Sequence, residues 1–187
     1  MTTLYILAGV ALAAIVVIVL FNQLIAKRQM VNNGWADIDV QLKRRADLIP
    51  QLVTTVQAYA AHERNLFEEV AEKRNAALAA GDNATARSEA ESALSKPVGR
   101  LIALGEAYPD LKANQNFLDL QNELSDTENK IEMARRFYNG AVRELNTAVE
   151  SFPSNLVAAL FGIAKRAFFE ITAAGDRAVP TLGLNPQ

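Results

Sequence analysis

The sequence predicts an all-α fold in which an N-terminal transmembrane helix is followed by an elongated antiparallel up-and-down helical bundle. Three observations predict it. Residues 4–21 form an uninterrupted apolar run without charge or proline. After this run glycine is scarce, alanine is abundant and β-branched runs are absent, which favours helices. Large apolar residues recur every seven positions between residues 117 and 152, which indicates a long helix with one buried seam.

The apolar run is long enough to cross a bilayer. As a helix it would measure about 27 Å, close to the hydrocarbon thickness of about 30 Å. A cleaved signal peptide is the alternative, but its positive charges would precede the run, whereas Lys27 and Arg28 follow it. We therefore expect an uncleaved anchor that contacts membrane lipid through residues 4–26. The two cations predict that the N-terminus is outside and the body is cytoplasmic.

Composition limits what the rest of the chain can be. We expect residues 1–28 to be the anchor with its basic flank, residues 29–174 to be one cytoplasmic helical bundle, and residues 175–187 to be an irregular tail. The chain has 19 Lys and Arg against 21 Asp and Glu, a net charge of −2, which argues against nucleic acid as a partner. It has no cysteine, so a disulfide framework is excluded.

Prolines and glycines divide the first half of the body. We expect the anchor helix to continue to residue 47 and Pro50 to begin a second helix over residues 50–80, because a first-turn proline loses no needed hydrogen bond. A turn at residues 81–83 then leads to a third helix over residues 84–107. Pro97 lies inside this third helix and should kink it.

The seven-residue repeat is the clearest pattern in the chain. Its large apolar members are Phe117, Leu124, Ile131, Tyr138, Leu145 and Phe152. Three residues after most of them lies a small side chain, so large and small residues alternate along the seam. The pattern predicts a helix over residues 111–152, about 60 Å long, which would need the second and third helices as partners.

A final helix is predicted over residues 155–173, after Pro153. It is apolar on several faces, which is unusual for a surface helix. Three interpretations follow: burial within the fold, packing on another subunit, or contact with the bilayer interface. Phe161, Phe168 and Phe169 in this segment are therefore candidate oligomer or partner contacts.

The sequence offers no catalytic or metal site. His62 is the only histidine, and cysteine is absent. A ferritin-like di-metal site needs two histidines, and zinc needs further nitrogen or sulfur ligands. Glycine-rich nucleotide-binding loops are missing as well. We therefore expect no enzyme activity, no cofactor and no metal.

Two features along the predicted first helix are candidate contacts. Lys43, Arg44 and Arg45 form a basic cluster. In a continuous helix Lys43 would stand about 24 Å beyond Lys27, well past the Debye length of about 8 Å, so acidic residues in the fold or on a neighbour are better partners than lipid headgroups. Trp35 is also too far from the membrane for an interfacial belt, and we expect it to pack.

Several motifs stand at residues 35–45, 47–50, 52–53, 107–117, 127–129, 134–135 with 138–139, 152–153 with 155, and 161–162. Together they resemble the LemA family over nearly the whole chain. The resemblance implies a bacterial membrane protein with an N-terminal span, a cytoplasmic antiparallel bundle and no established catalytic residues. Some relatives are associated with membrane invagination. Ala46 stands where a histidine is common in the family, and Pro97 stands where relatives continue the helix.

We expect a single-pass scaffold that self-assembles at the cytoplasmic face of the bacterial inner membrane and serves in membrane organisation or remodelling. Homo-oligomers would use ion pairs from the basic cluster to Glu63, Glu69 or Asp110 of a neighbour. The alternative is a monomeric tethered adaptor that presents its bundle to another membrane or signalling protein.

Overall fold

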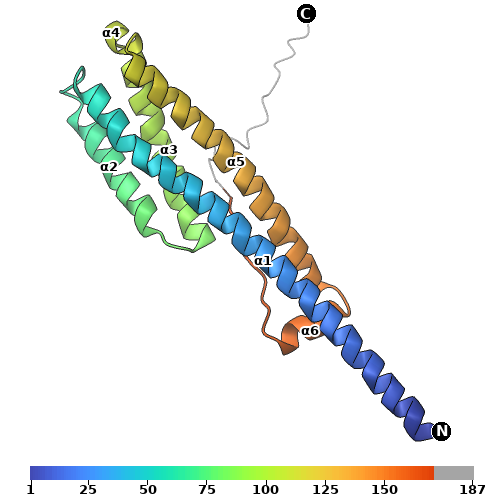
Figure 1. Cartoon of the computed structure of the whole chain (residues 1–187). Coiled ribbons are helices and arrows are strands. Elements are labelled where there is room, and N and C mark those ends of the chain that lie inside the picture. The colour runs from blue at the N-terminus through green and yellow to red at the C-terminus, as the bar shows by residue number, and fades with distance from the viewer. Residues whose placement is uncertain (171–187) are drawn as a thin grey trace, which may run out of the picture. The chain divides into compact units, whose positions relative to one another are not determined.

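A computed structural model describes residues 1–170, and within this range the chain forms six helices and no strand. They are α1 (Thr2–Gln57), α2 (Arg64–Ala79), α3 (Ala84–Glu106), α4 (Pro109–Lys112), α5 (Gln115–Glu150) and α6 (Ser154–Leu160) (Figure 1). The predicted all-α class, with one long apolar N-terminal helix followed by further helices, is confirmed. The tail predicted at residues 175–187 lies outside the described residues.

The chain divides into two units. The first contains residues 1–45 and 124–168, and the second contains residues 46–123 and continues from residue 169. Helices α1 and α5 each contribute one part to each unit.

In the first unit, α1 and α5 run antiparallel. Lys27 Nζ lies 2.9 Å from Glu144 Oε2, and Arg45 Nη1 lies 2.7 Å from Glu128 Oε1. The residue number on α5 thus falls as the number on α1 rises. Between these pairs, a Cβ on Gly34 would lie 3.0 Å from Phe137 Cδ1 and from the Tyr138 backbone. This glycine allows the two helices to approach closely.

The N-terminal part of α1 is not packed against any described residue. Residues 1–19 are all exposed, and the first buried residue is Leu24. By length and composition α1 can cross a membrane. Because such a run of exposed apolar side chains needs an apolar environment, the structure agrees with the predicted anchor.

The predicted start of a second helix at Pro50 is wrong, because α1 continues through this proline to Gln57. A proline in a helix cannot donate to the carbonyl four residues earlier, here that of Ala46. In the second unit, Arg74 Nε of α2 donates to this Ala46 oxygen at 2.5 Å. A side chain therefore replaces the missing backbone donor, and α2 begins only at Arg64.

Helices α2 and α3 form a packed pair in the second unit. Gly81, with φ of +62°, makes the turn between them, which is a conformation that favours glycine. Asn83 caps α3, since its side chain accepts from the backbone of Thr85 and Ala86, each at 3.0 Å. The third helix is thus found where it was predicted, with Pro97 inside it.

Helix α5 confirms the predicted seam. Phe117, Leu124, Ile131, Tyr138 and Leu145 are all buried. The helix is shorter than expected, because α4 precedes it and it ends at Glu150. Phe152, the sixth member of the repeat, therefore lies beyond the helix and is exposed.

The final helix predicted over residues 155–173 is also wrong in extent, because α6 ends at Leu160. Gly162 has a φ of +65°. Its N–H donates to the Ala159 carbonyl, and the Ile163 N–H donates to the Ala158 carbonyl at 2.9 Å. These two bonds form a Schellman C-cap, which stops the helix, and residues 161–170 are not helical. Residues 171–173 lie outside the described range.

Candidate interaction sites

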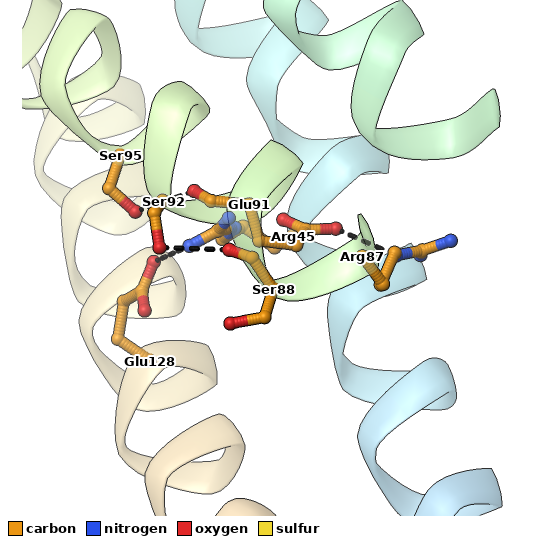
Figure 2. Close-up of polar contacts among 7 residues, drawn as sticks. All are labelled: Arg45, Arg87, Ser88, Glu91, Ser92, Ser95 and Glu128. Carbon is orange, nitrogen blue, oxygen red and sulfur yellow. Dashed lines mark hydrogen bonds and ion pairs between the residues drawn. The ribbon is translucent and has the colours of Figure 1, made fainter. Parts of the chain in front are cut away.

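The three residues of the basic cluster on α1 differ in how far they are buried. The Arg45 side chain is only 2% exposed and forms its ion pair with Glu128 of α5 within the first unit (Figure 2). Lys43 and Arg44 are exposed. One signal in the sequence could have singled out Arg45: it lies on the same helical face as buried Ile38, Leu42 and Ile49, three or four residues from each neighbour on that stripe.

Arg44 acts on the neighbouring helix through its charge. The pKa of the Asp126 carboxyl is lowered, chiefly by the hydrogen bond from Lys130 at 2.6 Å, and the positive charge of Arg44 adds to this effect. Arg44 therefore faces the acidic side of α5 within the first unit. Lys43 is the member of the cluster that is exposed without a described acidic partner.

Trp35 packs within the first unit. Its ring lies 5.6 Å from that of Tyr138, centroid to centroid, in a tilted arrangement. The Tyr138 hydroxyl donates to the Ala167 carbonyl at 2.9 Å, and burial raises the pKa of this hydroxyl. Tyr138 therefore remains a neutral donor at physiological pH and ties the segment after α6 to α5.

The three phenylalanines after α6 are placed differently. Phe161 is exposed in part, and its ring lies 4.5 Å from that of Phe21 on α1. Phe168 is also partly exposed. Phe169, in the second unit, is fully buried. Of these three candidates, Phe161 and Phe168 are the ones whose side chains reach the surface.

A groove of about 460 Å³ lies beside the end of α5 in the first unit. Its lining residues are Arg143, Asn146, Thr147, Glu150, Lys165, Arg166 and Phe168. Asn146 exchanges two hydrogen bonds with the backbone of Arg166, at 2.8 and 2.9 Å, and Lys165 pairs with Glu150 at 2.6 Å. The polar groups of these residues are thus paired within the chain, and their hydrogen bonds and ion pair hold the segment after α6 on α5.

A buried ion pair in the second unit was missed by sequence reasoning. Arg87 Nε lies 3.0 Å from Glu91 Oε1 within α3, and both side chains are buried (Figure 2). Nearby, Ser92 Oγ donates to the Ser88 carbonyl at 2.8 Å. The i,i+4 spacing is visible in the sequence, but it is typical of exposed pairs. Because an unpaired buried charge is costly, each of these two side chains needs the other to remain buried.

His62 lies beside a tyrosine hydroxyl and a carboxylate. Its Nε2 lies 3.5 Å from the Tyr108 hydroxyl and 3.6 Å from Glu63 Oε1, on an exposed turn of the second unit. In residues 1–170, no group of three or more His, Cys, Asp or Glu side chains could hold a metal ion.

Comparison with known proteins gives one family. The model of the LemA family matches residues 34–183. Magnetosome protein MamQ 2 of Paramagnetospirillum magneticum is 22% identical over 86% of this chain and 68% of its own length. Magnetosome protein MamQ of Magnetospirillum gryphiswaldense is 23% identical over 78% of this chain and 63% of its own. Protein LemA of Metamycoplasma hominis is 25% identical over 80% of this chain and 68% of its own.

Proposed function

Because the chain belongs to the LemA family and is a membrane-associated helical protein, we propose that it is a single-pass scaffold that self-assembles at the cytoplasmic face of the bacterial inner membrane. Its role would be membrane organisation or remodelling. We propose a structural role without catalytic activity. The similarity to the magnetosome proteins MamQ supports a membrane-associated role.

One observation carries self-assembly: an exposed apolar face on α5 of the first unit. Met133 and Phe137 lie one helical turn apart, so they share a face, and about half of each side chain is exposed. Adjacent exposed apolar residues on a packed body mark interaction sites. Exposed Lys43 on α1 is the cationic candidate in the same unit.

The test is the native mass of the full-length chain in mild detergent, measured by size-exclusion with light scattering and followed by particle imaging. We expect a uniform oligomer. Met133→Glu combined with Phe137→Glu should lower its mass at least twofold, because two buried carboxylates would destabilise the contact. The matched control is Leu78→Glu with Leu118→Glu, which changes two exposed apolar residues of the second unit and should leave the mass unchanged.

The same measurement tests the cationic candidates. Lys43→Glu with Arg44→Glu should also lower the mass, while Lys96→Glu with Lys112→Glu, an equal change at exposed positions, should not. A monomeric wild-type chain would contradict the scaffold. It would favour the alternative, a tethered adaptor that presents its helices to another membrane or signalling protein.

A further inference from the structure

The end of the first unit carries an exposed apolar group that packing within the chain does not explain. It consists of Phe152, Leu156, Leu160 and Phe161, which are between 49% and 80% exposed, and we name it the apolar tip. On the other side of α6, Val157 and Ala158 are buried. The short helix is therefore apolar on both sides, and a helix of this kind at a water-exposed surface is unfavourable.

The apolar tip lies at the level where the membrane span ends. The ring of Phe161 contacts that of Phe21, the last residue of the apolar run, at 4.5 Å. The helix register gives the same level independently. Lys27 pairs with Glu144, and since both helices rise about 1.5 Å per residue, the end of α5 at Glu150 comes level with Phe21. Figure 1 shows α6 beside α1 at this end of α5.

Charged residues flank the apolar tip on the side of the body. Lys27 and Arg28 follow the span, and exposed Lys165 and Arg166 follow α6. Apolar side chains toward the bilayer with cations behind them are typical of segments that lie in the membrane interface. A lipid surface is therefore the occupant that fits, because the span brings lipid to within a ring contact of Phe161.

We propose that the apolar tip inserts into the interfacial layer of the leaflet from which the span emerges, so that each chain contacts the bilayer at two places. The span and the tip together would hold the first unit at a defined rotation about the axis of α1. This inference rests on the membrane anchor of the proposed function and does not depend on self-assembly.

The absence of cysteine allows a direct test with single-cysteine variants of the full chain. Leu160→Cys is labelled with the environment-sensitive dye NBD and reconstituted into phosphatidylcholine–phosphatidylglycerol vesicles at a high lipid-to-protein ratio. We expect blue-shifted emission and at least threefold stronger quenching by lipids spin-labelled near the headgroup than at Val40→Cys, an exposed control on α1. Leu156→Cys is a second reporter in case the first label disturbs α6.

Three results would overturn the inference. Equal, water-like emission at residues 160 and 40 would show that the tip is in solvent. Blue-shifted emission that lipid spin labels do not quench, and that vanishes as lipid dilutes the protein, would show that a second copy covers it. Ile15→Cys reports on the span itself. If lipid spin labels do not quench the label at residue 15 either, the anchor is wrong, and both the proposed function and the inference are rejected. If they quench the label at residue 15 but not the label at residue 160, only the inference is rejected.

Discussion

At the scale of single residues, Gly105 sets how closely α3 and α5 approach in the second unit. A Cβ at this position would lie 2.4 Å from Cζ of Phe117, far inside van der Waals contact. Phe117 is completely buried and is the first member of the α5 seam. The Phe117 ring thus occupies the space that a side chain at position 105 would need. The repeat predicted that Phe117 is buried, but no local pattern marks Gly105 as its partner.

This pair predicts opposite effects for two glycines of the same helix. Gly105→Ala should destabilise the chain by about 1–3 kcal/mol, because the added methyl overpacks the core. Gly99→Ala, which has no atom within 4 Å of the new Cβ, should stabilise it by about 0.5–1 kcal/mol through helix propensity. Thermal unfolding of the full chain in detergent, followed by circular dichroism, measures both. Equal shifts for the two variants would contradict the close contact.

The basic cluster shows how far single-residue prediction reaches. The sequence indicates that three adjacent cations are available for acidic partners. The apolar stripe can single out Arg45 as the buried one, but it does not name the acidic partner, since that depends on the register between α1 and α5. The apolar stripe on α1 contains Arg45, and Glu128 of α5 lies opposite it, so the partner is found only when the two helices are placed together.

At the scale of elements, the long apolar N-terminal helix and the α5 seam were predictable because each repeats one signal over many residues. The errors came at single positions. Pro50 predicts a helix start, but the helix continues because Arg74, 28 residues from Ala46 in the sequence, donates to the Ala46 carbonyl. The sequence pattern places Gly162 within an apolar helix, but the C-cap formed with Ala158 and Ala159 ends that helix. A long-range donor cannot be inferred from local sequence.

The contact between Arg74 and the Ala46 carbonyl predicts coupling with Pro50. Arg74→Met should destabilise the chain by about 1–3 kcal/mol, since a charged donor is lost. In a Pro50→Ala background, the backbone N–H of residue 50 can bond the same carbonyl, so the cost of Arg74→Met should fall by about 1 kcal/mol. Denaturation midpoints of the four proteins complete the cycle. Additive costs would contradict the interpretation that Arg74 replaces the missing backbone donor.

At the scale of the whole molecule, the chain combines an exposed apolar helix end with a packed helical body. Residues 1–19 are exposed throughout, whereas α1 beyond Leu24 contributes to the core. Lys27 and Arg28 lie directly after the apolar run. Because cations next to a span favour the cytoplasmic side, these two residues predict a cytoplasmic body.

The orientation predicts which cysteine a membrane-impermeant maleimide can reach. In sealed spheroplasts that produce the full chain, Thr2→Cys should be labelled and Val40→Cys should not. Both should react after detergent is added, which controls for intrinsic accessibility. Labelling of Val40→Cys alone in sealed spheroplasts would show the reverse topology and reject the cytoplasmic body.

Helix α1 runs without a break from Thr2 to Gln57, and this continuity joins the first unit to the physical state of the lipid. A span adapts to a thinner or thicker bilayer by changing its tilt. A hinge between Phe21 and Leu24 would absorb that tilt, but the helix has none there. The first unit should therefore tilt together with its anchor, so that a change in bilayer thickness changes the angle between the first unit and the membrane.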